Sequence, residues 1–537
     1  MNVQVSASWL FGISTIVALW IAPDKSAALV AAGLLLGGLM GAWLLAWVGR
    51  ARATRVALLG CLGLAVTAGA AMLALYAVMS GSLAAEAQSS AINANVLAGA
   101  LVISLAMGAM GAVWLWAQLV PSPRWWIVAA LAVWGVLWLG SALVLIATGS
   151  RGAWGALLVA ALAAAGWMLR PWAARRMRGA GAAVDAAFLV AAATGVALWL
   201  GWLQMAPPDL PAGDRVALWR DGLALAGDAP FTGSGLRSTM MALSTYVYIL
   251  HVGYISHVHN LYLELAVEQG LLGLIAWLCL VCSALSALVQ ARSRRVTPIG
   301  MQAALLAALV ALLVHGLVDA GLYASRLAFL IFLPIGAAWA AGGRAHAADL
   351  EARSRRLLGA LAPLAAVALL FAWPGSRAGW QANLGVTAQT QAELFLYTWP
   401  EWPMQDALRR SPAIDLEPAV ARYQAALAID PTDAVANRRL GQIALSQGDL
   451  SQARVLLEAA YLHSPAHVAT RLLLGEVYAL DGETTRAAAL WQTIDVHLGQ
   501  LAGRRWWVNH SASAAQRTNF DAALAELAAL GGGRSSE

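Results

Sequence analysis

The chain has 537 residues, of which 60% are hydrophobic and only 12% are charged, and its mean hydropathy is +0.67. A soluble protein carries roughly 25% charged residues, so this composition excludes a soluble globular protein and predicts a polytopic membrane protein. The net charge of +6 does not indicate a nucleic-acid partner, because the basic excess lies in short segments between apolar runs.

Apolar runs close to the roughly 20 residues that span a bilayer recur along the first 373 residues. Arginine clusters follow the second, sixth, eighth and tenth runs, so they share one side, which the positive-inside rule makes cytoplasmic. We therefore expect an all-α membrane domain of about 11 spans over residues 1–373. Its N-terminus would be cytoplasmic and its long loop 206–258 periplasmic, although the first run is short enough to be tilted or re-entrant. The runs lie at about 8–22, 26–49, 56–79, 94–119, 125–148, 153–169, 183–205, 261–291, 299–319, 326–343 and 357–373.

Three arginines fall on the predicted outer side. Arg151 lies in a tight turn between two apolar runs, where it could simply reach lipid headgroups or bind phosphate with its guanidinium fork. Arg215 and Arg220 lie in a segment whose spacing is compatible with an amphipathic helix along the surface. Downstream, Gly233 and Gly235 form a turn that could bring backbone amides near a phosphate, which is a weak signal.

Two histidines and an asparagine precede the eighth apolar run. His257 and His259 are followed by Asn260, a good helix N-cap residue. Polar groups are costly at the mouth of a membrane segment unless they are used, so His259 is the first candidate for catalysis and His257 the second. The alternative is that Asn260 only caps the helix and both histidines are interfacial. The run continues for about 31 residues, or about 46 Å as a helix.

Four further residues are candidates for supporting roles. Glu264 and Glu268 are spaced i,i+4, so they share a helix face, which we expect to stand above the bilayer on the outer side. His315 and Asp319 have the same spacing near the outer end of the ninth run, where a structural His–Asp hydrogen bond competes with a catalytic role. The two-residue spacing of His257 and His259 is not that of a helical zinc site, so we predict no metal and no cofactor.

The chain becomes more polar after residue 374, and residues 374–537 are expected to form a second, helical domain. Its net charge is negative, since residues 377–537 hold 13 Arg and 16 Asp or Glu. A period of 34 residues with an early Leu-Gly, a later Ala and a closing Pro is typical of tetratricopeptide repeats. The repeats, at about 415–495, would offer an extended surface to a protein partner; the alternative is a stabilising lid over the outer loops. The positions that repeat are Leu440 and Leu474, Gly441 and Gly475, Gly448 and Gly482, Ala453 and Ala487, and Pro431 and Pro465.

In order and spacing, the motifs of residues 140–343 resemble the O-antigen ligase/polymerase superfamily. This resemblance implies a GT-C-like enzyme of the bacterial inner membrane that takes glycan from undecaprenyl diphosphate at the periplasmic face, without metal and with inversion. It also implies that Arg151 and Arg215 hold the diphosphate and that His259 is the essential histidine. The motifs that carry it are Ser150-Arg151-Gly152, Arg215-x-x-Leu218-Trp219, Pro230-x-x-Gly233-x-Gly235, His259-Asn260-x-x-Leu263 and Glu268-x-Gly270-x-x-Gly273.

The leading hypothesis is therefore transfer of an oligo- or polysaccharide from a polyprenyl diphosphate onto an acceptor hydroxyl. The superfamily includes lipopolysaccharide ligases, glycan polymerases and protein O-oligosaccharyltransferases, so the acceptor could be lipid A-core, a glycan or a protein. The helical tail favours a protein-glycosylating or polymer-assembly member. A hypothesis of another class is a non-catalytic membrane scaffold for envelope polysaccharide assembly.

Overall fold

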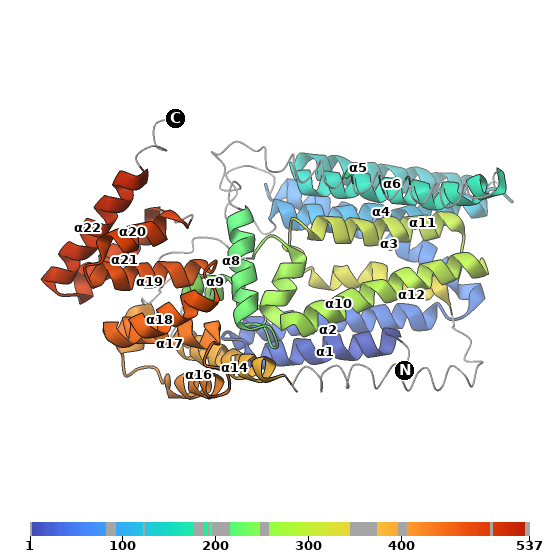
Figure 1. The fold of residues 1–537 in the computed structure, drawn as a ribbon. Coiled ribbons are helices and arrows are strands. Elements are labelled where there is room, and N and C mark those ends of the chain that lie inside the picture. Colours follow the sequence, from blue (N-terminus) through green and yellow to red (C-terminus); the bar gives the residue numbers. More distant parts are fainter. Residues whose placement is uncertain are drawn as a thin grey trace.

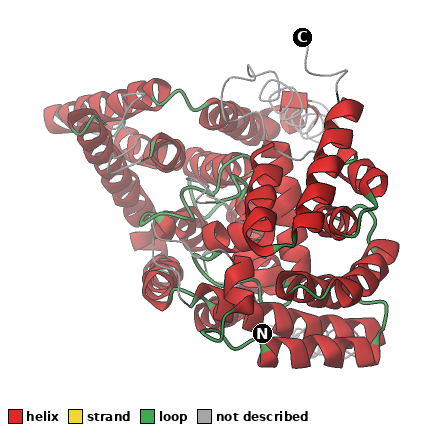
Figure 2. Cartoon of the chain, turned by 90° about the vertical axis from the view of Figure 1, so that its left-hand side faces the viewer, coloured by secondary structure: helices red, strands yellow, loops and turns green. Residues whose placement is uncertain are grey.

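A computed structural model of the chain describes residues 3–81, 93–121, 124–176, 215–247, 257–343, 373–395, 405–494 and 498–531, with four single positions between 187 and 195. Throughout these residues the protein is helical, with no strand (Figure 2). Two helical parts lie side by side along the long axis, a bundle of long apolar helices and an array of shorter helices at one end of it (Figure 1).

Eight helices of the described part are long and apolar enough to cross a membrane. They coincide with the first six apolar runs and with the eighth and ninth, and the tenth forms a shorter apolar helix. The first run is a helix of 19 residues, which is enough for a span. The runs at 183–205 and 357–373 lie largely outside the described residues. The bundle comprises α1 (Val3–Ile21), α2 (Lys25–Val48), α3 (Arg52–Met79), α4 (Ala94–Leu119), α5 (Trp125–Ala147), α6 (Arg151–Arg176), α10 (Leu261–Arg294), α11 (Ile299–Gly316), the 3-10 helix η2 (Ala328–Phe332) and α12 (Leu333–Gly342).

The core of the bundle is built from close helix pairs and one aromatic cluster. Helix α4 is buried along most of its length between α3, α5, α6 and α11. Phe332 of η2 packs edge to face on Phe11 of α1 and Trp277 of α10, which are tilted relative to each other, with ring centroids 5.5 to 6.4 Å apart. Such aromatic contacts favour one relative placement of the three elements, and this fixes α10, the helix that follows the two histidines.

Helices α8 (Arg215–Asp228) and α9 (Thr239–Val247) lie at the end of the bundle that faces the shorter helices, and α8 stands upright between the two parts (Figure 1). The predicted outer loop 206–258 is therefore partly helical. The array beyond it comprises α14 (Pro374–Leu394), α15 (Gln405–Arg410), α16 (Glu417–Ile429), α17 (Ala434–Gln447), α18 (Leu450–His463), α19 (Val468–Leu480), α20 (Thr484–Gln492), α21 (Leu498–Ser511) and α22 (Ala514–Gly531).

The 34-residue repeat is confirmed by equivalent close contacts in successive helix pairs. A Cβ on Gly441 of α17 would lie 2.7 Å from Leu457 of α18, and one on Gly475 of α19 would lie 2.3 Å from Trp491 of α20. Gly448 and Gly482 both have a φ of +89°, at the turns that follow α17 and α19. Glycine is therefore required for the approach of each helix pair and for the turn within it.

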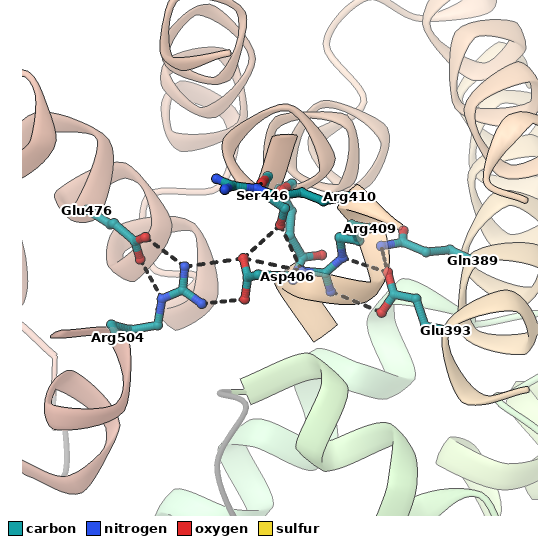
Figure 3. Close-up of polar contacts among 9 residues, drawn as sticks. Gln389, Glu393, Asp406, Arg409, Arg410, Ser446, Glu476 and Arg504 are labelled. Atoms are coloured by element: carbon teal, nitrogen blue, oxygen red, sulfur yellow. Dashed lines mark hydrogen bonds and ion pairs between the residues drawn. The ribbon is translucent and has the colours of Figure 1, made fainter. Parts of the chain in front are cut away.

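Buried ion pairs join α14 and α15 to the repeats (Figure 3). Arg409 donates to Glu393 at 2.7 Å, whereas Arg504 of α21 donates to Asp406 of α15 and to Glu476 of α19, each at 2.6 Å. All five side chains are buried. Because each charge is paired, the network places α15 with little freedom between α14 and the repeats.

Candidate active site

The turn before α10 is held by hydrogen bonds at both ends. Asn260 accepts from the backbone N–H groups of Tyr262 and Leu263 at 3.1 and 3.0 Å, which confirms the predicted N-cap. Its Nδ2 also donates to the carbonyl of Leu317 at 2.9 Å. One side chain therefore fixes the start of α10 against the end of α11.

His259 has a φ of +51°, in the left-handed region that residues with a Cβ seldom adopt. Strained backbone of this kind costs about 1–3 kcal/mol and persists only where the surroundings hold it. Here Asn260 caps the helix after it, and the N–H of Val258 before it donates to the Glu264 carboxylate at 2.8 Å. This conformation places the His259 imidazole beside Asp319.

Asp319 links the two histidines. Its Oδ2 lies 3.2 Å from Nδ1 of His259 and 3.7 Å from Nε2 of His257, and its Oδ1 accepts from the N–H of Gly321 at 2.6 Å. Burial alone would raise the pKa of the Asp319 carboxyl, but its contacts with the two histidines outweigh burial and hold the pKa well below its usual value. Asp319 is therefore an anion at neutral pH, and its contacts with His259 and Gly321 hold it in place.

The two imidazoles differ in their protonation. Burial lowers the pKa of His259, and although Asp319 opposes this, the nearby His257 adds to it, so the pKa of His259 stays below the usual 6.5. For His257 burial lowers the pKa, but the Asp319 carboxylate 3.7 Å away outweighs burial and raises the pKa. His259 is thus mostly neutral at pH 7, the form that can accept a proton.

Two arginines complete the cluster. Arg215, the first residue of α8, donates to the carbonyl of Val318 at 3.2 Å, next to Asp319. Burial lowers the pKa of Arg215, Asp319 raises it and the charge of Arg151 lowers it, so these three groups share one electrostatic environment. Arg151 begins α6 directly after a turn in which Gly149 has a φ of +67°. Arg215 therefore lies beside the His259–Asp319 pair, and Arg151 is near enough for its charge to act on Arg215.

Arg220 does not join this cluster through any contact among the described residues. It lies five positions after Arg215 on α8, so it points about 140° away around the helix, and it is exposed. A role for Arg220 in binding diphosphate stays a prediction.

Glu264 and Glu268 are buried within the protein, and only 0% and 2% of their surface is exposed. Their expected place above the bilayer on the outer side stays a prediction. Glu264 holds the N–H of Val258, and Glu268 accepts from the hydroxyl of Tyr323 at 3.0 Å. The hydropathy pattern could not reveal this burial, because the partner of Glu264 is a backbone N–H and the partner of Glu268 lies 55 residues away.

The predicted single long helix is interrupted at Gly270, which has φ +68° and ψ −175°. The glycine turn fits into this break rather than presenting its amides to a phosphate. The N–H of Ser234 donates to the Val267 carbonyl at 2.7 Å, and that of Gly235 donates to the Glu268 carbonyl at 3.1 Å. A Cβ on Gly233 would lie 2.5 Å from the Glu268 backbone. The phosphate role suggested for Gly233 and Gly235 is therefore wrong.

His315 occupies a different position from the one its spacing predicted. The side chain of Asp319 bonds to His259 rather than to His315, while the backbone N–H of Asp319 donates to the His315 carbonyl at 3.0 Å. His315 is buried and lies with Asp319 along a cavity of about 10 Å³, which is room for about one water molecule. The partner of His259 was thus missed, because i,i+4 spacing assigned Asp319 to the wrong histidine.

His257, His259 and Asp319 also have the donor types of a zinc site. One ligand atom from each lies within 4.8 Å of those of the other two. The spacing of the two histidines in sequence did not indicate this group, because its third member comes from the end of α11. The three residues could therefore hold a metal ion, and the histidine–carboxylate pair could equally act without one.

These features define a class of protein, a multi-pass helical membrane protein with a histidine–aspartate–arginine cluster at the end of its bundle that faces a helical array. Residues 135–278 match the family model O-Antigen ligase, and residues 415–460 and 444–495 match a tetratricopeptide repeat model. The sequence has no match among curated proteins. The chain thus carries an O-antigen ligase domain, with the glycan ligase or polymerase type of function that this implies, followed by tetratricopeptide repeats. The ligase match includes Arg151, Arg215 and His259 but not Asp319.

Proposed function

We propose that this protein transfers a glycan from a polyprenyl diphosphate, in bacteria undecaprenyl diphosphate, onto an acceptor hydroxyl at the periplasmic face of the inner membrane. The observation that carries this proposal is the 3.2 Å contact of His259 Nδ1 with Asp319 beside the guanidinium of Arg215. A neutral imidazole oriented by a carboxylate is suited to accept a hydroxyl proton. The neighbouring cations are suited to the negative charge of a leaving diphosphate.

In this reaction Asp319 accepts a hydrogen bond from Nδ1–H of His259, so the lone pair is on Nε2, which takes the proton of the acceptor hydroxyl. The acceptor oxygen forms a bond with the anomeric carbon while the bond from that carbon to the diphosphate oxygen breaks. The electron pair of the broken bond stays on the diphosphate. A single displacement of this kind inverts the anomeric centre and needs no metal.

Arg151 and Arg215 would bind the diphosphate and stabilise the charge that grows on it as the bond breaks. Arginine suits this role because its planar fork can meet two phosphate oxygens at once. Arg215 is half-buried, and exclusion of water strengthens its attraction for a phosphate. The raised pKa of His257 favours its protonated form, and a proton on His257 would place a further positive charge near the site.

The acceptor class is the open part of the proposal, since lipid A-core, a second lipid-linked glycan and a protein all present hydroxyl groups. The repeats favour a protein or an assembly partner, because stacked helix pairs offer an extended surface to a polypeptide.

The test is a transfer assay with purified protein in lipid nanodiscs and an undecaprenyl-diphosphate-linked glycan. Lipid A-core, a second lipid-linked glycan and a pilin-like protein are offered in turn. His259→Asn is the decisive variant, because asparagine tolerates the left-handed backbone that this position adopts. We expect it to insert and bind donor like the wild type and to lose transfer. Full transfer by His259→Asn would refute the assignment of the base, and no transfer by the wild type to any acceptor would support a non-catalytic scaffold.

A further inference from the structure

Helix α8 begins in the candidate active site and ends in the repeats. Asp228, its last residue, is 2% exposed and is paired with two arginines of α17. Its Oδ1 accepts from Arg438, and its Oδ2 accepts from Nη2 and Nε of Arg439 at 2.9 and 3.2 Å. Both arginines are buried as well, with 2% and 4% of their surface exposed. This is a charge cluster sealed between the loop region of the membrane domain and the repeat domain.

Apolar contacts surround the ion pairs on both sides. Ala229, directly after α8, is buried in the core formed by α14, α16 and α17. Ala469 of α19 is buried in the other direction, in a cluster with Leu225, Ala226 and Val258 of the loop region. Each domain thus contributes a residue to the core of the other, which is the behaviour of one folded unit rather than of two domains on a linker.

This shared core reaches the catalytic turn itself. Val258 lies between the two histidines, and a Cβ on Gly222 of α8 would approach Val258 to 2.9 Å and Leu263 to 3.0 Å. Glycine at position 222 therefore lets the middle of α8 lie directly on the turn. Arg215 lies 13 residues before Asp228, or about 20 Å along the helix. Helix α8 accordingly contacts the site at its start and its middle and is anchored to the repeats at its end.

A second connection holds the segment after α8. Asn383 of α14 accepts from the backbone N–H groups of Phe231 and Thr232 at 3.0 and 3.4 Å, and its Nδ2 donates to the Thr232 hydroxyl at 2.8 Å. The ring of Phe231 packs edge to face on Trp380, with centroids 5.5 Å apart. The chain on the C-terminal side of Asp228 is thereby fixed to α14.

We propose that the repeat domain positions the diphosphate-binding arginine of the membrane domain, and that Asp228, bound by Arg438 and Arg439, is the positioning residue that transmits this through α8 to Arg215. This inference rests on the proposed function, because it assigns Arg215 to the donor. Asp228 touches neither donor nor acceptor. Asp228 sets the direction of α8 and thereby the position of the Arg215 guanidinium at the other end of the helix.

The charges explain why Asp228 in particular connects α8 to Arg438 and Arg439 of the repeats. Burial would raise the pKa of Asp228, but the two guanidinium groups outweigh it and lower the pKa below its usual value, so the carboxylate is ionised at neutral pH. Without that charge, two buried guanidinium groups lose their counter-ion, which is more costly than the absence of the whole cluster. The neighbouring His467 cannot serve as a counter-ion, because an imidazole carries no negative charge; burial and Arg438 lower its pKa to about 3, so it is neutral at pH 7.

The experiment compares wild type, Asp228→Asn and a matched control, Asp406→Asn. Asp406 is a buried aspartate paired with Arg504 inside the array, away from α8. The first readout is hydrogen–deuterium exchange of the α8 amides in nanodiscs, which does not depend on any activity. The second is the dissociation constant for undecaprenyl diphosphate. If Asp228→Asn does not insert into the membrane, Arg439→Gln is used in its place. It removes one of the two arginine partners, and Arg438 still pairs with Asp228.

We expect Asp228→Asn to speed α8 exchange by at least about 10-fold, since α8 would open locally. We also expect it to weaken diphosphate binding by about 10-fold, since small misplacements of a binding group have effects of that order, and to lower kcat as well, because Arg215 also stabilises the departing diphosphate. Asp406→Asn should lower the melting temperature and leave both readouts unchanged. Unchanged α8 exchange in Asp228→Asn would overturn the proposal, as would faster exchange with unaltered diphosphate affinity. If the wild type does not bind undecaprenyl diphosphate while Asp228→Asn still speeds α8 exchange, the proposed function is wrong. The connection of α8 to the repeats through Asp228 is then still supported.

Discussion

Replacement of Asp319 by asparagine tests the proposed chemistry with a minimal change of shape. The Asp319 carboxylate accepts from Gly321 N–H at 2.6 Å through one oxygen and contacts His259 Nδ1 at 3.2 Å through the other. In Asp319→Asn the carbonyl oxygen can keep the Gly321 contact, which turns the amide NH₂ toward His259. Nδ1 must then accept a hydrogen bond, so the proton of a neutral His259 moves to Nε2. An imidazole in that tautomer cannot take a proton from an acceptor hydroxyl.

The size of the effect follows from what is lost. A positioned general base contributes about 10²- to 10⁴-fold to a rate, which corresponds to about 2.7–5.5 kcal/mol of transition-state stabilisation. The fixed negative charge that stabilises a protonated His259 disappears together with the correct tautomer. We therefore expect kcat for transfer to fall by about 10³-fold. Binding of undecaprenyl diphosphate should stay within about 3-fold of wild type, because Arg215 is held by the Val318 carbonyl and not by this carboxylate.

The assay is single-turnover transfer at saturating donor, with diphosphate binding measured on the same preparation. Asp406→Asn is a suitable control, because it also removes a buried carboxylate that is paired with arginine but lies in the repeat domain. If Asp319→Asn retained transfer within about 5-fold of wild type, the assignment of His259 and Asp319 as base and orienting group would be wrong.

Three further predictions concern the arginines, the pH dependence and the metal. Lysine at Arg151 or Arg215 should impair transfer nearly as strongly as alanine, because it keeps the charge and loses the fork. Arg176→Lys, at an exposed arginine stacked on Trp172, should have no effect. If the lysine variants of Arg151 and Arg215 kept near-normal transfer, these two arginines would contribute only general positive charge. Transfer should be constant from about pH 8 to 7 and fall below pH 6.5, because the pKa of His259 is lowered and protonation of His259 removes the base; a fall that begins above pH 7 would contradict this. Dialysis against a chelator should leave the rate unchanged, whereas a loss restored by added Zn²⁺ would identify His257, His259 and Asp319 as metal ligands.

Much of the fold could be predicted, because membrane spans and helical repeats each produce a recognisable pattern over a short stretch of sequence. Apolar runs of span length correspond to the eight long helices of the described part, and the 34-residue period gave the repeats. The cap at Asn260 followed from residue type alone. Each of these depends on neighbours in sequence, and so a single chain is enough to find it.

What failed depended on contacts between distant segments. Asp319 has His315 four residues before it, yet the tertiary fold gives it His259 at a separation of 60 residues. The buried positions of Glu264 and Glu268 depend on Val258, on Tyr323 and on the break at Gly270, none of which hydropathy detects. Asp228 was not a candidate at all, because only the docked repeats bring Arg438 and Arg439 to it.

Removal of the repeats is the prediction that the structure changes most. From the sequence alone, deletion of everything after Pro374 should leave donor hydrolysis or binding measurable, while transfer to the physiological acceptor falls sharply. In the structure, truncation would expose Ala229 and leave Asp228 without its counter-ions, and it would remove Ala469 from the core that contains Val258. We therefore expect the truncated protein to insert but to bind undecaprenyl diphosphate at least about 10-fold more weakly, with α8 exchanging freely. Co-expression of the array as a separate chain should restore binding only if it retains Arg438 and Arg439. Wild-type affinity of the truncated protein for undecaprenyl diphosphate would contradict this expectation. The repeats would then serve only to bind a partner.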